Sequence, residues 1–346
     1  MNLQRLDKAW KRWLVPDKTG KRGGRPKFKS RGEKPSFSFS RVNHPKAACT
    51  FLGSVIKIPR IGNVAVIVHR PIPDGFVLKT ATICCRADGW YVSISAADES
   101  IPEAKLPTLP EVTSGRKAAV HSAPLETIKS AVGVDVGLKV FLATSTGTFV
   151  PVPQIYRKAQ AHLARQQRTL ARREKNSKNQ DWQKSRIAKI HQRIARQREK
   201  FHYQIAHKLC RDYDLIAVED LNIRGLARTK MAKSIYDVAW GKFLTVLESV
   251  AVKCGVHFVK VSPYNTTQDC SQCGTKVPKT LSIRTHECHK CGLSMDRDEN
   301  AAVNILEKGL QAVGLTVSAC GALVDGQALR QELLDVNLEA YVTAPA

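Results

Sequence analysis

The feature that most constrains this chain is a pair of Cys-x-x-Cys motifs that lie close together. Cys270 and Cys273 form the first motif, Cys288 and Cys291 form the second, and fourteen residues separate them. Each motif can turn two thiolates toward one ion, so the two together complete a tetrahedral site with no open coordination position. We predict that the four cysteines bind a structural Zn²⁺ and that residues 265–295 form a zinc ribbon around it.

Two other interpretations explain less of this cluster. His286 and His289 lie near enough in sequence to replace a cysteine as ligand, and a redox-active Cys-x-x-Cys pair would explain one motif but not the second. The basic first 40 residues lack the apolar segment of a signal peptide, which argues against a disulfide framework. The six other cysteines are predicted to be small buried hydrophobic residues: Cys49, Cys84, Cys85, Cys210, Cys254 and Cys320.

The charge balance indicates a polyanionic partner. The chain has 55 Lys and Arg against 30 Asp and Glu, a formal charge of +25. Such an excess repels itself unless an anion relieves it. No apolar run approaches the roughly 18 residues that would span a bilayer, so we expect DNA or RNA rather than a membrane.

The positive charge is concentrated in a long helical segment, residues 154–209, which has 16 Lys and Arg against three acids. We expect a helical hairpin that breaks near Asn176–Asp181. A run of charge is often only a solvated helix face, but surface helices usually mix both signs. Six arginines are predicted to contact a nucleic-acid backbone: Arg165, Arg168, Arg172, Arg186, Arg193 and Arg196.

The first third of the chain changes character twice. Residues 1–42 are basic, with a helix expected at Leu3–Leu14, and the segment Arg25–Arg31 followed by Phe37 and Phe39 interleaves cations with aromatic rings. That mixture suits either nucleic-acid binding or a solvated linker. Residues 43–108 contain short β-rich runs and predict a small antiparallel barrel or sandwich. A proline-containing linker is expected at 109–130.

Strands that alternate with helices predict an α/β core from residue 131 onward. The expected core strands begin at Ala131, Val140, Leu215 and Val256, with helices at Trp240–Lys253 and Glu299–Lys308. The core would occupy residues 131–264, and its last helix would occupy 296–310. No role is assigned to the tail, residues 311–346.

Three acidic residues stand at the ends of these core elements. Asp135 falls inside an apolar strand just before a glycine turn, Glu219 ends another strand, and either Asp296 or Asp298 begins the last helix. An acid beside an apolar strand is costly unless it is exposed or paired. Hydrolysis of a phosphodiester by two metal ions needs carboxylates that hold the ions about 4 Å apart. One such acid alone would be a turn or capping residue, but the three positions together predict a site for a pair of Mg²⁺ ions.

Four motifs in this order resemble the TnpB (OrfB-type) proteins of small bacterial insertion sequences, which are related to type V CRISPR effectors. They are Val132–Gly137, Val218–Leu221, the four-cysteine ribbon and Asp296–Ile305; a looser likeness covers 8–97, including Gly24–Arg31. The resemblance implies an RNase H-like (RuvC) core with an inserted hairpin and ribbon, preceded by a wedge-like barrel. It also implies a guide RNA and target DNA as partners.

Carried onto this chain, the catalytic Mg²⁺-binding acids of that family fall on Asp135, Glu219 and Asp298. Asp298 is preferred to Asp296 because the family's aspartate stands two residues before an asparagine, here Asn300. The resemblance implies a transposon-encoded, RNA-guided DNA endonuclease of the bacterial cytoplasm and nucleoid, with an N-terminus shorter than usual. The alternatives are an inactive nucleic-acid-binding remnant or repressor, and a DNA-joining transposase.

Overall fold

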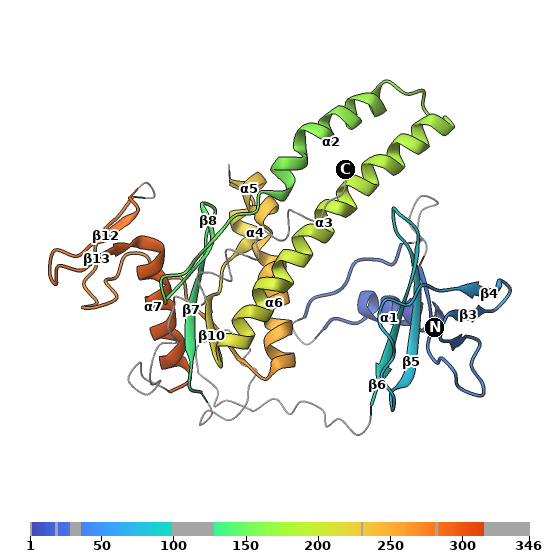
Figure 1. The fold of residues 1–346 in the computed structure, drawn as a ribbon, viewed down its shortest axis with the longest axis horizontal. Coiled ribbons are helices and arrows are strands. Elements are labelled where there is room, and N and C mark those ends of the chain that lie inside the picture. The colour runs from blue at the N-terminus through green and yellow to red at the C-terminus, as the bar shows by residue number, and fades with distance from the viewer. Residues whose placement is uncertain are drawn as a thin grey trace. The chain divides into compact units, whose positions relative to one another are not determined.

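The computed structural model describes residues 2–17, 20–27, 36–98, 128–229, 231–280 and 283–314 (Figure 1). The chain divides into two compact units, Met1–Glu103 and Ala104–Ala346. Most of the expected linker, part of the segment Arg25–Arg31, and the tail from residue 315 onward, with Cys320, lie outside the described residues. The last helix, α7 (Arg297–Ala312), extends two residues beyond its expected end at residue 310.

In the described residues, the N-terminal unit contains one helix and two small antiparallel sheets. Its helix is α1 (Asn2–Leu14). One sheet has the order β1-β5-β6 and the other has the order β2-β3-β4. The bounds are β1 (Ser36–Phe39), β2 (Thr50–Leu52), β3 (Val55–Ile58), β4 (Gly62–Ala65), β5 (Val77–Cys85) and β6 (Trp90–Ala97).

The structure corrects the expectation for Phe37 and Phe39. Both lie in β1, which pairs with β5, so the β-rich part starts before residue 43. Residues two apart point to the same face of a strand, and here the two rings meet edge to face with centroids 5.9 Å apart. They pack against the core that contains Phe51 and Ile83. These rings stabilise the sheet and are not part of a basic arm.

The C-terminal unit is built on a five-stranded mixed sheet of order β11-β10-β7-β8-β9. Strand β8 is antiparallel to both β7 and β9, while β10 is parallel to both β7 and β11. The bounds are β7 (Ala131–Val136), β8 (Val140–Thr144), β9 (Phe149–Pro151), β10 (Leu215–Glu219) and β11 (His257–Val261).

Helices cover both faces of this sheet. Val132 and Val134 of β7 belong to the core shared with Phe201 of α3 (Lys178–Asp212) and Phe243 of α6 (Trp240–Cys254). Ala131, Leu215 and Ala217 belong to a second core on the opposite face, which is shared with Ile305 of α7 (Arg297–Ala312). Because strand side chains alternate between faces, Asp135 and Glu219 lie on the α7 face.

The basic segment forms α2 (Ile155–Ala171) and α3, which pack against each other and project from the sheet (Figure 1). The connection at 172–177 comes slightly earlier than the expected break. The buried Gln183 donates from Nε2 to the backbone oxygen of Gln166 at 3.0 Å and to its Oε1 at 2.9 Å. Two short helices follow β10: α4 (Ile223–Leu226) and α5 (Ala232–Val238).

The cysteines outside the ribbon only partly match their predicted burial. Cys49 and Cys210 are buried, Cys84 and Cys85 are half-buried, and Cys254 is exposed. The prediction for Cys254 is wrong because this residue ends α6, where the helix leaves the core. Within the described part of the chain, no helix is both long enough and apolar enough to cross a membrane.

Candidate functional site

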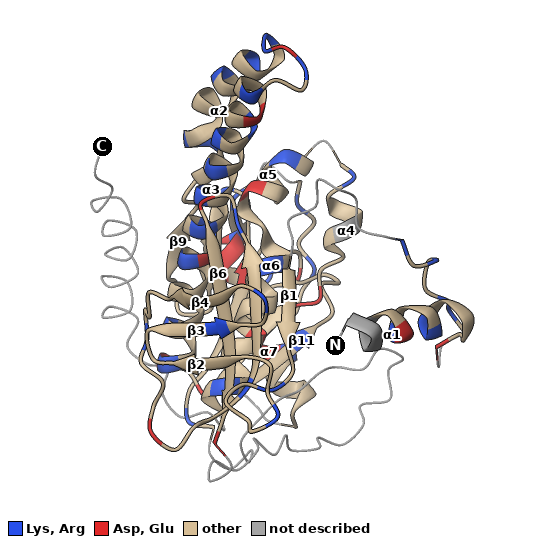
Figure 2. Cartoon of the chain, turned by 90° about the vertical axis from the view of Figure 1, so that its right-hand side faces the viewer, with Lys and Arg blue, Asp and Glu red and all other residues tan. Residues whose placement is uncertain are grey.

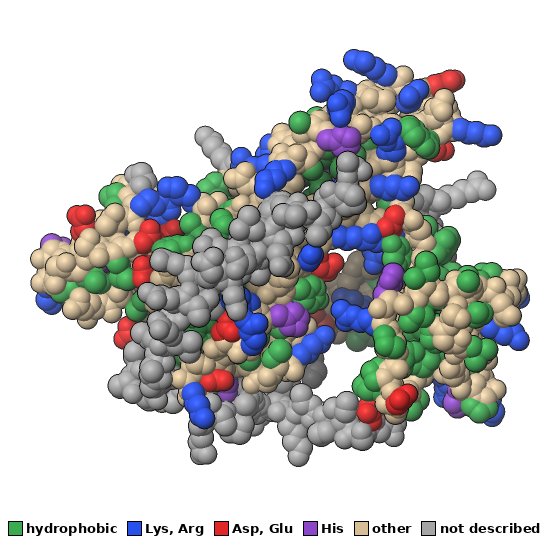
Figure 3. Space-filling model, in the orientation of Figure 1, with side chains coloured by type: hydrophobic (Ala, Val, Ile, Leu, Met, Phe, Trp, Pro, Cys, Tyr) green, Lys and Arg blue, Asp and Glu red, His purple; other side chains and the backbone are tan. Residues whose placement is uncertain are grey.

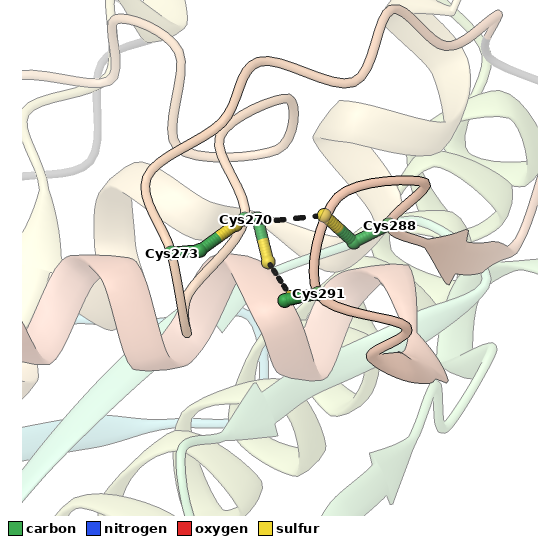
Figure 4. A group of neighbouring side chains, drawn as sticks. All are labelled: Cys270, Cys273, Cys288 and Cys291. Carbon is green, nitrogen blue, oxygen red and sulfur yellow. Dashed lines mark hydrogen bonds between the residues drawn. The ribbon is translucent and has the colours of Figure 1, made fainter.

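The four predicted zinc ligands come together in the ribbon, whose strands are β12 (Thr285–Glu287) and β13 (Ser294–Asp296) (Figure 4). Their sulfur atoms all lie within 4.8 Å of one another. The Sγ atoms of Cys270 and Cys291 are 3.6 Å apart, and those of Cys273 and Cys288 are 3.5 Å apart. A tetrahedron with Zn–S bonds of about 2.3 Å has sulfur–sulfur edges of roughly 3.8 Å, so the cluster fits one zinc ion.

The surroundings of the sulfurs favour the thiolate form at two of the four cysteines, whereas at Cys291 burial and the neighbouring thiols outweigh a hydrogen bond from the Leu293 backbone and raise the pKa to about 12. Hydrogen bonds from Thr275 lower the pKa of Cys273 to about 6. A backbone hydrogen bond from Cys291 lowers the pKa of Cys288. His286 is buried and receives a contact from the Lys279 ammonium at Nδ1. In the described residues, neither histidine belongs to the metal-competent group, so the geometry favours four sulfur ligands.

Asp135 and Glu219 are brought together by strand pairing. Strands β7 and β10 are parallel, and Val134 is the register partner of Val218. Asp135 and Glu219 are the next residues on the two strands, and neighbouring strands lie about 4.8 Å apart. Both residues are half-buried and, from their positions in the strands, face α7.

Asp298 reaches the same face because α7 lies unusually close to the sheet. A Cβ atom added to Gly133 would lie 2.0 Å from the backbone oxygen of Ala302, so only glycine fits there. A Cβ added to Gly309 would likewise lie 2.4 Å from the Cβ of Ala217. These two glycines let the helix sit directly on β7 and β10, with Asp298 in its first turn.

The two aspartates of the Asp296–Asp298 motif have different surroundings. The Oδ1 atom of Asp296 accepts hydrogen bonds from the backbone N–H groups of Asp298 at 2.7 Å and Glu299 at 3.4 Å, so Asp296 caps α7. Asp298 instead pairs with Arg297 at 2.8 Å and with Arg284 at 3.4 Å. The arginines hold this carboxylate at the start of the helix.

The three carboxylates interact electrostatically. Burial raises the pKa of Asp135 well above its usual range, and the charges of Glu219 and Asp298 raise it further. Burial also raises the pKa of Glu219, against the opposing effect of a 2.5 Å hydrogen bond from the Thr266 hydroxyl. Carboxylate oxygens are the ligands that Mg²⁺ prefers, so the donor types suit this ion; among the described residues, however, only the four cysteines, and not the three carboxylates, bring their ligand atoms within 4.8 Å of one another.

Several residues around the acids were missed from the sequence. Gly133, Thr266 and Arg284 carry no signal of their own along the chain, and only tertiary packing brings them to the acids. The pairing of Arg297 with the adjacent Asp298 could have been predicted from the sequence, because an arginine next to a buried acid often pairs with it. Asn300 helped to select Asp298, but its own contacts were not foreseen.

The six predicted nucleic-acid-binding arginines are all exposed on α2, on α3 or in the connection between them. Lys and Arg residues occur along both helices (Figure 2), and their side chains gather over the end that projects away from the sheet (Figure 3). The structure does not bring them to the acid cluster; they form a separate, extended basic surface.

Known proteins match most of this chain. Residues 111–230 match the OrfB_IS605 family, described as "Probable transposase", and residues 240–305 match the Cas12f1-like TNB domain. A "Putative RNA-guided DNA endonuclease" of Streptomyces pristinaespiralis is 30% identical over 308 residues, which are 87% of this chain and 68% of the relative. The chain belongs to the OrfB/TnpB family. The resemblance inferred from the sequence motifs is thereby confirmed.

Two further similarities concern this TnpB-family chain. The "Putative RNA-guided DNA endonuclease InsQ" of Escherichia coli is 27% identical over 349 residues, which cover 96% of this chain and 78% of the relative. A solved Cas12f1–sgRNA–target DNA complex aligns with a TM-score of 0.38 and 17% identity. That alignment covers 65% of this chain and 55% of the Cas12f1 chain.

Proposed function

We propose that this TnpB-family chain is an RNA-guided, Mg²⁺-dependent DNA endonuclease encoded by a transposon, with Asp135, Glu219 and Asp298 as its catalytic acids. Family membership and the names of the two relatives support the activity. The observation that carries the assignment of the site is geometric: Asp135 and Glu219 are neighbours in register on the parallel strands β7 and β10, and α7, which has Asp298 in its first turn, packs closely on the same face. Two strands and a helix would thus supply the three acids of one site.

The fold supports the same proposal. We interpret the mixed sheet, with β8 antiparallel to its neighbours and β10 and β11 parallel to β7, as an RNase H-like core. The pair α2–α3 would be a hairpin inserted into it, and the ribbon a second insertion before α7. The antiparallel N-terminal unit would correspond to the wedge-like barrel.

Two kinds of metal site follow from the donor sets. The three carboxylates would hold a pair of Mg²⁺ ions, and the four cysteines would hold one structural Zn²⁺. Bound Mg²⁺ supplies a Lewis acid that lowers the pKa of water and stabilises the leaving oxygen. The protein's own contribution is positional: Arg284 and Arg297 orient Asp298, and Thr266 orients Glu219.

The basic residues of α2 and α3 would supply the nucleic-acid-binding part of the function. The exposed arginines of α2 and α3 would contact phosphates of the guide RNA or of its duplex with target DNA. Such contacts give affinity and register but do not read sequence. Base pairing with the guide would select the target, which fits a basic surface that follows two whole helices.

The decisive experiment is cleavage of a plasmid by the purified complex with RNA transcribed from the sequence flanking the gene. We expect Mg²⁺-dependent cutting of the matching plasmid and a loss of at least about 1000-fold in Asp135→Ala. Asp296→Asn is the matched control, because asparagine keeps the helix cap while removing a neighbouring charge. Undiminished cutting by Asp135→Ala would overturn the proposal.

The same assay separates the alternatives. Tight, guide-dependent binding without cutting at millimolar Mg²⁺ would instead indicate a repressor or an inactive remnant. Covalently joined DNA products would indicate a strand-transferring transposase.

A further inference from the structure

The end of the α2–α3 pair carries an exposed tryptophan. Trp182 lies in the second turn of α3 and is 56% exposed. Its indole ring lies under the guanidinium of Arg186, whose Cζ is 4.8 Å from the ring centroid. Single exposed hydrophobic residues are common, but an aromatic ring paired with a guanidinium on a strongly basic hairpin is the combination that single-stranded nucleic acids bind.

The surroundings of Trp182 are rigid. The Ser177 hydroxyl caps α3 by accepting a hydrogen bond from the Gln180 N–H at 3.1 Å. Next to Trp182, the side chain of Gln183 is buried and joins α3 to Gln166 of α2. These contacts fix the helix that carries the ring, so its backbone need not be ordered when a partner binds.

We propose that Trp182 and Arg186 form a stacking platform for an unpaired base of bound nucleic acid, with the guanidinium beside the adjoining phosphate. Residues 154–209 carry 16 Lys and Arg against three acids, so a polyanion is the complementary partner. Aromatic rings beside cations bind single strands by stacking without requiring a particular base. The platform deepens the proposed function by giving the hairpin a contact with bases as well as with phosphates.

The test measures binding of a fluorescein-labelled single-stranded oligonucleotide by anisotropy, without Mg²⁺, so that cleavage plays no part. We expect Trp182→Ala to weaken binding roughly tenfold and Trp182→Phe to stay within about twofold, because phenylalanine keeps a stacking face. Trp90→Ala is the matched control, since Trp90 is 60% exposed but lies in the other unit.

Two results would overturn the platform. The first is equal affinity of Trp182→Ala and the unaltered protein for the single strand. The second is an equal weakening by Trp182→Ala of binding to a blunt duplex of the same length, because a duplex offers no unpaired base along its length. Since the assay needs no cutting, it stands even if the proposed nuclease activity fails, and unchanged melting temperatures would verify that the variants remain folded.

A different set of contacts links the ribbon to the acid cluster. The Thr266 side chain is almost fully buried, and its hydroxyl lies 2.5 Å from Oε1 of Glu219 and 3.2 Å from the backbone oxygen of Pro263. A hydroxyl donates one proton, and the shorter distance favours donation to Glu219. Cys270, the first zinc-ligand candidate, lies only four residues further along the chain.

The segment between Thr266 and Cys270 is clamped to α7 by buried amides. Asn304 donates to the backbone oxygens of Thr266 at 2.8 Å and Asp269 at 2.7 Å. Asn300 donates to the Asp269 oxygen at 2.9 Å and accepts from the Ser271 N–H at 3.0 Å. Residues four apart share one face of a helix, so this face of the helix that carries Asp298 also holds the segment that contacts Glu219.

We infer that Thr266 is a positioning residue for Glu219 and that Asn300 and Asn304 make this position depend on the first cysteine knuckle. The inference rests on the proposed function. The segment from Thr266 to Cys270 would then bear on two acids, because it contacts Glu219 directly and is bound to α7, the helix that carries Asp298. The ribbon fixes the other end of this segment. Removing an outer hydrogen-bond partner of a metal-binding side chain typically lowers metal affinity or activity roughly 10- to 100-fold.

The test compares Thr266→Val with Thr266→Ser, since valine matches the shape of threonine and serine keeps the hydroxyl. We expect Thr266→Val to slow single-turnover cleavage about 10- to 100-fold and to raise the half-saturating Mg²⁺ concentration, with target binding unchanged. Thr266→Ser should stay within about threefold. Equal behaviour of the two variants would overturn the inference.

Calorimetric titration of Mg²⁺ into the nucleic-acid-free protein gives a second readout. Weaker binding by Thr266→Val than by Thr266→Ser is expected there too, and it would hold even if no cutting were found. Identical Mg²⁺ affinities of the two variants would contradict the inference, whatever the fate of the proposed nuclease activity.

Discussion

The cysteine cluster and the carboxylate cluster lie in the same unit but are assembled in different ways. The cysteines meet because two tight turns within one short ribbon each present a pair of sulfurs. The carboxylates come from β7, β10 and α7, and they lie on one face of the sheet because the strands are paired in register and α7 packs closely on that face. Local spacing predicts the first kind of site, whereas long-range packing determines the second.

The largest effect on the structure is expected when the cysteine cluster is removed. Replacing both Cys288 and Cys291 by serine should abolish zinc binding, because only two of the four sulfur ligands would remain. Structural zinc contributes about 10–16 kcal/mol of apparent binding free energy in small zinc domains. We expect the ribbon to unfold while the five-stranded sheet remains. Zinc content and amide hydrogen exchange would measure this, and a protected ribbon without zinc would contradict it.

The next effect tests the close packing of α7. Gly133→Ala should destabilise the protein by about 1–3 kcal/mol or more, because the added methyl would overlap the backbone of α7. Displacing α7 would also move Asp298, so cleavage should fall together with stability. Gly241→Ala in α6 is the matched control, since its nearest neighbour would be 3.7 Å away. Equal melting temperatures of the two variants would disprove the packing argument.

A smaller effect on thermal stability is expected from the repulsion between the charges of the acid cluster. The pKa of Asp135 is higher in the folded protein than in the unfolded chain. The folded state therefore binds this proton more tightly, and stability falls as pH rises from the unfolded pKa toward the folded one. Without divalent ions, Asp135→Asn should melt higher than the unaltered protein at pH 7, by about 2–4 °C for each kcal/mol of relieved repulsion.

That difference should shrink as the pH is lowered to about 4 and below, near the unfolded pKa of an aspartate, where the carboxyl group takes up its proton in both states. Asp181→Asn, an exposed change on α3, provides the comparison. A constant difference across the pH range would rule out the electrostatic cause.

The smallest effect concerns individual arginines of the hairpin. An arginine that neutralises one phosphate of duplex DNA contributes about 0.9 to the slope of log affinity against log salt, so its replacement should reduce the slope by that amount. Gln substitutions at Arg165, Arg168 and Arg193 can be compared with Arg211→Gln, which lies at the sheet end of α3. An unchanged slope in the first three variants would show that these arginines do not contact phosphates and are only exposed to solvent.

These two clusters also show how far the sequence alone could go. The ribbon, the main core strands and α7 were predictable, because each has a local pattern of spacing or alternation. The role of Gly133 was not, because nothing near it in sequence indicates that Ala302 lies above it. The arginine partners of Asp298 and the hydroxyl beside Glu219 were missed for the same reason. Phe37 and Phe39 were misjudged because their pairing strand begins about 40 residues later.

The length of α3 has a mechanical consequence. Its 35 residues span about 52 Å, from the basic tip to the core around Phe201 and Ile205. Only Tyr213 and Asp214 separate its last turn from β10, the strand that ends in Glu219. Because the helix is continuous and its connection to β10 is this short, a force applied at the tip would act on the end of that strand.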